Sequence, residues 1–558
     1  MDDVDSVQAQ IARNMLQSGD WVTARLDGVA YLEKAPLKYW LIAISYMIFG
    51  VHDWAARIPL AIATILLCWV TARFGAWAFG WRTGLYSGIV LSTSVGLFLF
   101  TRILIPDVML TLAITVALWG FLRALDEQET QPGIWAFAMW GAMGAGLLLK
   151  GLIAAVFPVA AALLFLSLTR QLFSRKTWLR LRPGPGVAVL LAIAIPWHVL
   201  ATLKNPPYFD FSMHSESGSY HGFFWFYFIN EHLLRFLNLR YPRDYNTVPR
   251  LYFWLLHLVW LFPWSVYLPA ALKLSYRGTS RAGRVRLLAA SWAGFILVFF
   301  TFSTTQEYYS MPCYPALALL LGSAIASDDQ WLRRGTKILA AVLSAALVII
   351  VSILWAVRGM PTAGDISVAL NQNPDLYTLS LGHMADLTLR AFAYLRLPLA
   401  IAGAAVAIGA FETWRRAMPV TALALMMLLF FHAARLALVG FDPYLSSRPL
   451  AEELLRQPSG QLIAADQYYT FSSVFFYTNR RGLLLNGRVN NLEYGSYAPD
   501  APKDVFIADN DLARLWIQST RYYLVAEGPA VSHLASLLGQ GALHELAHSG
   551  GKYLFTNR

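Results

Sequence analysis

The sequence predicts a mainly α-helical, polytopic membrane protein that ends in a small α/β domain. Of its 558 residues, 57% are hydrophobic and only 14% are charged, and the mean hydropathy is +0.48. No soluble fold needs so many apolar side chains. Apolar runs long enough to cross about 30 Å of hydrocarbon recur from Ile58 to Val439 and then stop. The bilayer is therefore the solvent for most of the chain.

The apolar runs predict about twelve spans. Their expected positions are residues 58–76, 85–101, 108–124, 133–149, 151–168, 187–203, 252–273, 287–303, 313–327, 338–357, 395–412 and 418–439. The net charge of +11 is spread over short loops between these runs and does not gather on one amphipathic face. This distribution argues against nucleic acid as a partner and provides a signal for membrane orientation instead.

Basic side chains mark alternate loops, which the positive-inside rule places in the cytoplasm. These residues are Arg73, Arg82, Arg123, Arg170, Arg175, Lys176, Arg180, Arg182, Lys273, Arg277, Arg281, Arg284, Arg286, Arg333, Arg334, Lys337, Arg415 and Arg416. The remaining loops are then external, including the long ones. We therefore divide the chain into an external first segment (1–57), a transmembrane domain (58–439) and a periplasmic α/β domain (440–558).

The start of the chain does not fit this topology. An even number of spans places both termini outside, yet residues 1–18 contain no signal peptide or span that could carry the N-terminus across the membrane. The sequence therefore predicts that the natural protein has one further apolar span of about 20 residues ahead of Met1.

Two helices are expected in the first segment. Val7, Ile11 and Met15 repeat at helical spacing, which indicates a helix lying in the membrane interface with polar residues such as Asp5 and Arg13 facing away. Residues 36–51 form a second apolar piece that is too short for a full crossing, so an interfacial or re-entrant helix is expected there.

The composition changes after residue 439, where short apolar runs of strand length alternate with helical patterns and predict an α/β domain. The runs are residues 461–465, 472–477, 482–486, 512–518, 522–526 and 531–538. No dinucleotide, Walker, C-x-x-C or H-E-x-x-H motif is found, so no cofactor is implied. Cys68 and Cys313 are expected to be packing residues.

Acidic side chains provide the first candidate catalytic groups. Asp2, Asp3 and Asp5 lie at the start of the first helix, where a simple cap is the alternative to a role as general base or metal ligand. Asp107 lies in a turn so short that its carboxylate must be at the membrane boundary, where ionisable groups are costly and usually functional. Its alternatives are a helix cap or a structural ion pair with Arg102.

Candidate substrate-binding groups lie in the same external segments. Lys150 joins two long spans with almost no loop between them, and a bound phosphate would offset the cost of its position. Interface anchoring is the alternative for the aromatic and basic residues among the others. Zinc binding by the His and Glu residues of the 204–250 loop has little support from their spacing. The candidates are Tyr31, Glu33, Lys34, Lys150, His232, Arg235, Glu307, Tyr308 and Tyr309.

Taken in order, these elements resemble the bacterial branch of the protein O-mannosyltransferase superfamily, which includes aminoarabinose transferases acting on lipid A. The resemblance covers the chain from its first residue to about residue 440. The matching stretches are DDVDSVQAQIARNMLQSGDWVT (2–23), YLEKAPLKYW (31–40), AARIP (55–59), TRILIPD (101–107), LLLKG (147–151), NEHLLRF (230–236), PWS (263–265) and QEYYSMPCYPALALLLG (306–322).

The resemblance implies a GT-C fold with an external first loop that bears the essential acid. It also implies a polyprenyl-phosphate sugar as donor and inversion at the anomeric carbon. Many relatives carry Asp-Glu-x-Arg-Tyr where this chain has Asp-Asp-Val-Asp-Ser, so the key acid stays open among Asp2, Asp3 and Asp5.

The expected function is transfer of a sugar from a polyprenyl-phosphate carrier to an external acceptor, which could be lipid A, another envelope lipid or glycan, or a protein. Lys34 and Lys150 would hold the phosphate, and Asp3 would act on the acceptor hydroxyl. Asp107 would position the acceptor or share a divalent metal with the first-segment acids. The alternatives are a flippase for lipid-linked glycans and a ligase or polymerase that uses a diphosphate-linked glycan.

Overall fold

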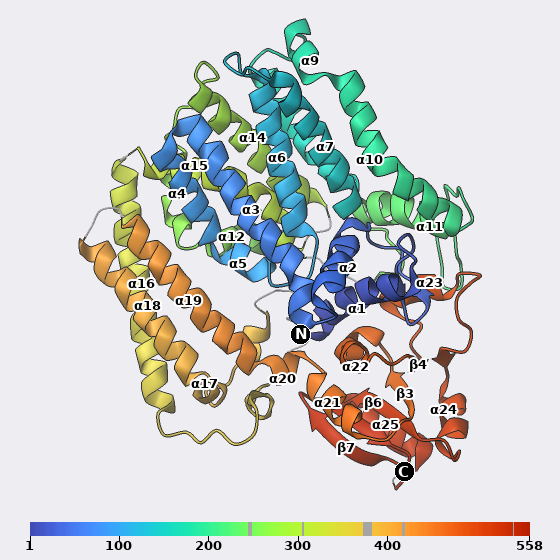
Figure 1. Ribbon diagram of the computed structural model, residues 1–558. Helices are drawn as coiled ribbons and strands as arrows, with labels where there is room; N and C mark the ends of the chain where they lie inside the picture. The colour runs from blue at the N-terminus through green and yellow to red at the C-terminus, as the bar shows by residue number, and fades with distance from the viewer. Residues whose placement is uncertain (244–247, 304–305, 328, 372–381, 416–418, 540) are drawn as a thin grey trace.

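The structure is a computed structural model of the whole chain, and it describes all residues except 244–247, 304–305, 328, 372–381, 416–418 and 540. A bundle of long helices forms one part of the molecule, and a mixed sheet with flanking helices forms the C-terminal part (Figure 1). The first residues of the chain lie between these two parts. Arg416 and the start of the span expected at 418–439 lie outside the described residues.

The bundle contains α3 to α19. Its helices are α3 (Asp53–Phe79), α4 (Trp81–Ser92), α5 (Val95–Phe100), α6 (Asp107–Leu125), α7 (Pro132–Lys150), α8 (Ile153–Leu168), α9 (Arg175–Leu181), α10 (Pro183–Lys204), α11 (Gly222–Phe224), η1 (Trp225–Leu234), α12 (Arg250–Trp260), η2 (Trp264–Tyr267), α13 (Leu268–Ala271), α14 (Arg281–Phe302), η3 (Glu307–Cys313), α15 (Tyr314–Ile325), α16 (Gln330–Val357), α17 (Ala391–Tyr394), α18 (Arg396–Arg415) and α19 (Val420–Gly440).

Eight helices of the described chain are long and apolar enough to cross a membrane, and the bent pair α12 and α13 brings the number to as many as nine. The chain is therefore a multi-span membrane protein. Each of the twelve predicted ranges contains helix, but α8 and α15 are short, with 16 and 12 residues. Two predicted spans are not continuous: residues 85–101 divide into α4 and α5, and residues 252–273 bend by 98°.

The two breaks support each other, because hydrogen bonds join them. Pro263 has no N–H to continue a helix after α12. The carbonyl of Phe262, which lies in this break, accepts a hydrogen bond from Val95 N–H, 3.3 Å away, at the start of α5. The indole N–H of Trp264 donates to Thr93 Oγ1 at 2.9 Å. Backbone groups opened inside the apolar bundle are thus satisfied within the protein, as a membrane environment requires.

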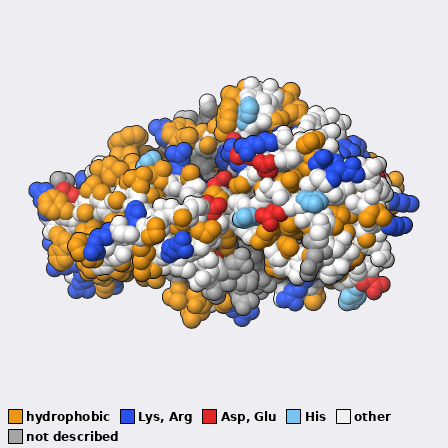
Figure 2. Space-filling model, turned by 90° about the horizontal axis from the view of Figure 1, so that it is seen from below, with side chains coloured by type: hydrophobic (Ala, Val, Ile, Leu, Met, Phe, Trp, Pro, Cys, Tyr) orange, Lys and Arg blue, Asp and Glu red, His pale blue; other side chains and the backbone are white. Residues whose placement is uncertain are grey.

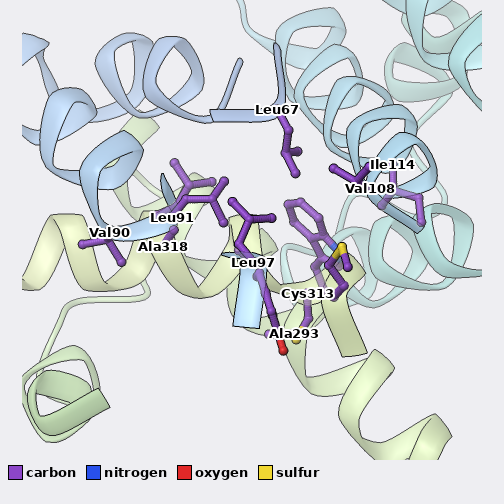
Figure 3. Packing of buried hydrophobic residues seen from close by; sticks show 14 of the residues in the cluster. Leu67, Val90, Leu91, Leu97, Val108, Ile114, Ala293, Cys313 and Ala318 are labelled. Carbon is purple, nitrogen blue, oxygen red and sulfur yellow. The ribbon is translucent and has the colours of Figure 1, made fainter. Parts of the chain in front are cut away.

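The core of the bundle is built from α3, α4, α5, α6, α14 and α15. Figure 3 shows Leu67, Leu91, Leu97 and Ile114 from these helices together with Cys313 at the end of η3, and all five belong to one buried cluster. Cys313 is fully buried and unpaired, as expected for a packing residue. Outer helices instead expose apolar side chains, such as Val348 and Trp355 of α16 with 65% and 68% of their surface accessible.

Figure 2 shows the molecule from below. Hydrophobic side chains dominate the side formed by α16, α18 and α19, and polar and charged side chains are more frequent over the C-terminal part. The exposed apolar side is the surface that would contact lipid.

The first segment folds onto both parts of the molecule. It contains α1 (Asp3–Ser18), the hairpin β1 (Arg25–Leu26) and β2 (Val29–Ala30), and α2 (Leu37–Phe49). Both expected helices are present, but α1 has no outward polar face: Asp5, Gln10 and Arg13 are buried as well as Val7 and Ile11. The expectation that Asp5 and Arg13 face away is wrong, because Asp5 contacts Arg57 of α3 and Leu104, and the C-terminal part covers Arg13.

The C-terminal part is a six-stranded sheet in the order β5-β4-β3-β6-β8-β7. Its elements are α20 (Asp442–Leu445), α21 (Arg448–Arg456), β3 (Gln461–Ala465), η7 (Tyr468–Phe471), α22 (Ser472–Thr478), β4 (Gly482–Leu485), α23 (Asn490–Ser496), β5 (Phe506–Ile507), α24 (Asp509–Trp516), β6 (Tyr522–Glu527), α25 (Gly528–Leu538), β7 (His544–Ser549) and β8 (Lys552–Thr556). The predicted alternation of strand and helix is confirmed. The antiparallel pair β7 and β8 was not predicted, because its alternation of polar and apolar residues is weak.

Close packing of α4 against α3 depends on Gly84. A Cβ atom there would lie 2.4 Å from the backbone nitrogen of Ala76 and 2.5 Å from the carbonyl oxygen of Ala72. Because backbone atoms cannot turn aside, Gly84→Ala should force the two helices apart and cost about 1–3 kcal/mol. The thermal midpoint of the purified chain in detergent measures this loss.

Gly294 of α14 provides the matched control, since a Cβ there meets nothing within 4 Å. Gly294→Ala should leave stability unchanged or raise it by up to about 1 kcal/mol. Equal thermal midpoints for the two alanine variants would contradict the close approach of α3 and α4.

The tip of the β1–β2 hairpin carries a buried acid. Asp27 and Gly28 have φ angles of 49° and 85°, the conformation of an Asp-Gly turn of type I′. Burial raises the pKa of Asp27 to about 7, against an ordinary value of 3.8. The folded state therefore holds this proton more tightly than the unfolded state, and the carboxyl group costs stability as the pH rises from 3.8 through 7.

Asp27→Asn keeps the turn and removes the charge. Its gain in thermal stability over the wild type should therefore be larger at pH 8 than at pH 5, by roughly 2 kcal/mol. Thermal midpoints of both proteins at the two pH values measure the difference. The same gain at both values would mean that Asp27 is ionised throughout.

Candidate active site

A cavity of about 160 Å³ lies where the first segment, the N-terminus of α6, the C-terminus of α7, η1 and η3 meet. Eight of the residues predicted from the sequence line it together: Glu33, Lys34, Asp107, Lys150, His232, Arg235, Tyr308 and Tyr309. Five predicted residues do not line it: Asp2, Asp3, Asp5, Tyr31 and Glu307.

Asp107 and Lys150 form the central ion pair of this cavity. Asp107 is the first residue of α6 and is only 1% exposed, and its Oδ1 accepts a hydrogen bond from Lys150 Nζ at 2.5 Å. Within the described part of the chain, Asp107 Oδ2 is buried without a hydrogen-bond partner. An ionised oxygen of this kind is costly unless a ligand completes it.

The ammonium group of Lys150 also contacts two aromatic rings. Its Nζ lies 4.5 Å from the ring centroid of Tyr309 and 5.2 Å from that of Tyr308. Both tyrosines belong to η3 and are among the candidate substrate-binding residues predicted from the sequence. The lysine is thus held between a carboxylate and two ring faces and keeps 21% of its side chain exposed.

A second group of charges enters from η1. Arg235 Nη1 donates to Glu231 Oε2 at 2.6 Å, and its Nη2 donates to the hydroxyl of Tyr309 at 2.9 Å. Arg240 Nε donates to the other oxygen of Glu231. Burial would raise the pKa of Glu231, but Arg240 and Arg235 outweigh this effect and hold the pKa well below its ordinary value. Glu231 therefore stays ionised and fixes both arginines.

Glu33 connects the cavity to two other parts of the molecule. Its Oε1 accepts hydrogen bonds from Arg240 at 3.2 Å and from Asn491 of α23 at 2.5 Å. Its Oε2 accepts from the hydroxyl of Tyr31 at 3.3 Å and lies 3.5 Å from Lys34 Nζ. Tyr31 in turn shares a hydrogen bond of 2.7 Å with Tyr469. Tyr31 thus supports Glu33 from behind the cavity wall.

His232 has a structural role. Its Nδ1 bonds the carbonyl of Tyr227, and its Nε2 accepts from Leu152 N–H at 3.2 Å. Both ring nitrogens are therefore engaged, and burial lowers the pKa of His232, which favours the neutral ring. The ring lies so close to Gly151 that a Cβ there would be 2.1 Å from Nε2. His232 thus fixes the turn that follows Lys150.

Asp5 holds the loop that precedes Asp107. Its Oδ1 accepts from Leu104 N–H at 2.6 Å, and its Oδ2 forms an ion pair with Arg57. The buried Lys38 of α2 donates to the carbonyl of Leu104 at 3.2 Å. Arg57 also donates to the carbonyl of Arg102. The first segment and α3 therefore fix the backbone three residues before Asp107.

The other two acids at the start of α1, Asp2 and Asp3, do not line the cavity. Asp3 is 6% exposed and faces the C-terminal part, where it accepts hydrogen bonds from Ser473 N–H at 2.8 Å, Ser447 Oγ at 2.9 Å and Lys552 Nζ at 2.7 Å. Asp2 caps α1 by accepting from Asp5 N–H at 2.8 Å. Burial and the neighbouring Asp5 raise the pKa of Asp2 to about 7. Asp2 is therefore a helix cap, which was one of the alternatives for this cluster.

Glu307 and a shared divalent metal are the remaining predictions for the site. Glu307 begins η3, is 2% exposed and does not line the cavity. Over the described ranges, no group of three or more His, Cys, Asp or Glu side chains is arranged to hold a metal ion. The acids expected to share a divalent metal with Asp107 lie outside the cavity lining.

Glu231 and the apolar wall of the cavity are not among the residues predicted from the sequence. Glu231 precedes Arg235 by four residues, a spacing at which opposite charges meet on one helix face, and this signal could have found it. Phe236, Phe299 and Phe300 also line the cavity. Nothing distinguishes these phenylalanines in the sequence from the others in the spans.

The helical bundle, the buried charges at one of its ends and the attached α/β part define a polytopic membrane protein of the GT-C type. The family model described as dolichyl-phosphate-mannose-protein mannosyltransferase matches residues 33–199. This range includes Glu33, Lys34, Asp107 and Lys150. The chain resembles the aminoarabinose-transferase-like branch of this GT-C superfamily.

Curated relatives agree with this assignment. An undecaprenyl phosphate-alpha-4-amino-4-deoxy-L-arabinose arabinosyl transferase of Pseudomonas aeruginosa (strain LESB58) is 30% identical over 341 residues, which are 59% of this chain and 56% of that protein. A relative of the same description from Shewanella sediminis is 26% identical over 501 residues, 88% of this chain and 83% of that protein. The chain spans little more than half the length of several curated relatives that it matches.

A solved structure supports the fold over almost the whole chain. The crystal structure of ArnT from Cupriavidus metallidurans bound to undecaprenyl phosphate superposes with a TM-score of 0.77 and 22% identity, and covers 99% of this chain and 93% of that one. The apo state of the same protein gives a TM-score of 0.77 at 23% identity. The bundle and the C-terminal part are thus arranged as in that fold.

The contact between Asp5 and Leu104 predicts a stability effect. Asp5→Asn keeps an acceptor for Leu104 N–H but leaves Arg57 without its charge partner. Because Asp5 is fully buried while Arg57 keeps 36% of its side chain exposed, the loss should be about 2–4 kcal/mol, at the lower end for broken buried pairs. The thermal midpoint of the purified chain measures it.

Asp20→Asn is the matched control. Asp20 pairs with Lys204 at 2.9 Å, but 50% of that lysine side chain is exposed, so removing the charge should cost less than about 1 kcal/mol. If the two variants lose the same stability, the Asp5–Arg57 pair does not hold the loop before Asp107.

Proposed function

We propose that the chain is a membrane glycosyltransferase that moves a sugar from a polyprenyl-phosphate carrier to an acceptor at the outer face of the bacterial inner membrane. The observation that carries this proposal is the cavity in which Lys34, Lys150 and Arg235 lie together with Asp107, whose second oxygen is buried without a partner among the described residues. The relatives named as arabinosyl transferases support the same reaction class.

The cations of the cavity suit a phosphate group. Lysine and arginine bind phosphate through charge-assisted hydrogen bonds, and Lys150 and Lys34 keep 21% and 32% of their side chains exposed. A lipid-linked phosphate would compete with Asp107 for Lys150. As Lys150 turns to the phosphate, the carboxylate of Asp107 is released toward the acceptor.

The apolar wall suits the lipid part of the donor. Phe236, Phe299 and Phe300 line the same cavity as the charged groups, so one ligand could place its phosphate among the cations and its isoprenoid chain among the rings. The related crystal structure from Cupriavidus metallidurans was determined with bound undecaprenyl phosphate, which is a ligand of this shape.

The charges at the two ends of α6 indicate how the chain is oriented in the membrane. Lys176 pairs with Glu127 at 2.5 Å and Arg281 pairs with Asp126 at 2.8 Å, so these basic loops share the end of α6 opposite to Asp107. With 19 residues, α6 is about 28 Å long, close to the hydrocarbon thickness of a bilayer. Since basic loops favour the cytoplasm, the cavity and the C-terminal part would lie in the periplasm.

The reaction then needs one nucleophile and one leaving group. The oxygen of the acceptor hydroxyl attacks the anomeric carbon from the face opposite to the phosphate, and the bond between that carbon and the phosphate oxygen breaks with inversion. Asp107 takes the hydroxyl proton, and Lys150, Lys34 and Arg235 stabilise the phosphate that leaves. Lipid A, another envelope lipid or glycan, or a protein could supply the acceptor hydroxyl; a phosphate acceptor would need no base.

Removing either member of the central pair tests this mechanism. Asp107→Asn and Lys150→Gln should each lower the rate of transfer by about 10²-fold or more, because general-base catalysis and stabilisation of the leaving phosphate each contribute on this scale. The measurement is release of polyprenyl phosphate from a radiolabelled polyprenyl-phosphate sugar by the purified full chain, with an envelope lipid extract as acceptor source.

Asp3→Asn provides the comparison, since it removes an equally buried charge that lies outside the cavity lining. It should lower the thermal midpoint, because Lys552 loses its partner, while transfer falls by less than about tenfold. Full activity of Asp107→Asn and Lys150→Gln, or a loss in Asp3→Asn as large as theirs at a temperature where all three are folded, would overturn this assignment.

A further inference from the structure

A second, polar cavity lies on the other side of the first segment. It has a volume of about 240 Å³, well above the roughly 10–15 Å³ that one buried water needs. Three parts of the chain enclose it: the C-terminal half of α1, the β1–β2 hairpin and the turn between α22 and β4. It shares no lining residue with the candidate active site. For brevity we call it the hairpin cavity.

The lining of the hairpin cavity includes a hydrogen-bond acceptor that the protein does not use. Gln10 is 7% exposed, and its amide nitrogen donates to Asn14 Oδ1 at 2.8 Å. This bond fixes the orientation of the amide. Gln10 Oε1 is buried and has no hydrogen-bond partner anywhere in the described ranges. It can accept a hydrogen bond from a hydroxyl group.

The same lining includes a guanidinium group with an unused donor. Arg480 is half-buried, and its Nη1 has no hydrogen-bond partner among the residues that the structure describes. The neighbouring Arg481 also lines the cavity and is exposed. Arg25, the third arginine, is already paired with Asp500 at 2.6 Å. Arg480 and Arg481 are thus the groups that can contact an anion, which guanidinium groups bind in a planar, bidentate manner.

Asp27 is the acid that faces these arginines. It lines the cavity at the hairpin tip, and both of its oxygens lie 3.4 Å from Gly482 N. The charged lining therefore consists of three arginines and one acid, and the balance favours an anionic ligand.

We propose that the hairpin cavity is a binding site for a saccharide that carries an anionic group, a phosphate or a carboxylate. The anionic group contacts Arg480 and Arg481, and a sugar hydroxyl donates to Gln10 Oε1. Because α1, the hairpin and the α22–β4 turn all contribute, the ligand joins the first segment to the C-terminal part. Its binding therefore stabilises the contact between these two parts and involves none of the groups at the candidate active site.

Isothermal titration of the purified full chain in detergent tests the proposal. The probes are glucose-1-phosphate, glucuronate, inorganic phosphate and glucose. At least one of the two anionic sugars should bind at least about tenfold more tightly than both phosphate and glucose, because only these probes use the arginines and Gln10 together. Equal binding of inorganic phosphate or of glucose, or no binding of either anionic sugar, would overturn it.

Three variants locate the site. Arg480→Gln should weaken binding of the anionic sugar by about tenfold or more, since it removes a charged donor. Asp27→Asn should strengthen it, since it removes the acid beside the arginines. Arg514→Gln is the control, because Arg514 lies on α24, outside the cavity lining, with 75% of its side chain exposed; its affinity should equal that of the wild type.

The binding variants also keep this proposal separate from the proposed function. Arg480→Gln should retain full transfer from the polyprenyl-phosphate donor while it loses binding of the anionic sugar. If Arg480→Gln binds the sugar as the wild type does, or if Arg514→Gln weakens binding equally, the ligand is not held in the hairpin cavity and the proposal fails.

Discussion

The backbone of Leu104 is held at its N–H and at its carbonyl by two buried ionisable side chains. Asp5 accepts from its N–H and Lys38 donates to its carbonyl. The position of Asp107 depends on this arrangement, because only two residues separate it from Leu104 and the helix α6 begins at Asp107 itself. A loop at the end of an apolar bundle would otherwise have unsatisfied backbone groups and no fixed conformation. The first segment therefore acts as the support on which the charged end of the bundle is built.

Features that depend on local sequence could be predicted, and features that depend on contacts between distant residues could not. Spans such as α3, α6, α16 and α19 could be predicted because uninterrupted hydrophobicity is a local property of the chain. The breaks after Ser92 and Trp260 could not be predicted from local pattern, since the hydrogen bond between Val95 and Phe262 that supports them joins residues far apart in sequence. The short helices α8 and α15 were nevertheless placed correctly from their apolar content.

At the candidate site, the residues predicted at the membrane boundary line one cavity, and the acids predicted at the start of the first helix do not. Lys34, Asp107 and Lys150 were singled out because charge next to an apolar span is costly, and they line one cavity. Asp3 carries the same charge, but its direction depends on the C-terminal part that covers this end of α1, which is more than 440 residues away in sequence. Asp5 instead points to Arg57 and Leu104. Periodicity alone gave α1 a polar face toward solvent, which the structure does not have.

The contact between Asp3 and Lys552 also has a consequence for biosynthesis. The two residues are separated by 549 positions, and Lys552 belongs to the last strand of the sheet. During translation the acidic start of α1 is made 549 residues before its partner Lys552. Until then α1 exposes a surface that in the finished molecule is buried. The order of synthesis thus makes docking of the C-terminal part a late step, one that completes the first helix only after all the spans have been inserted.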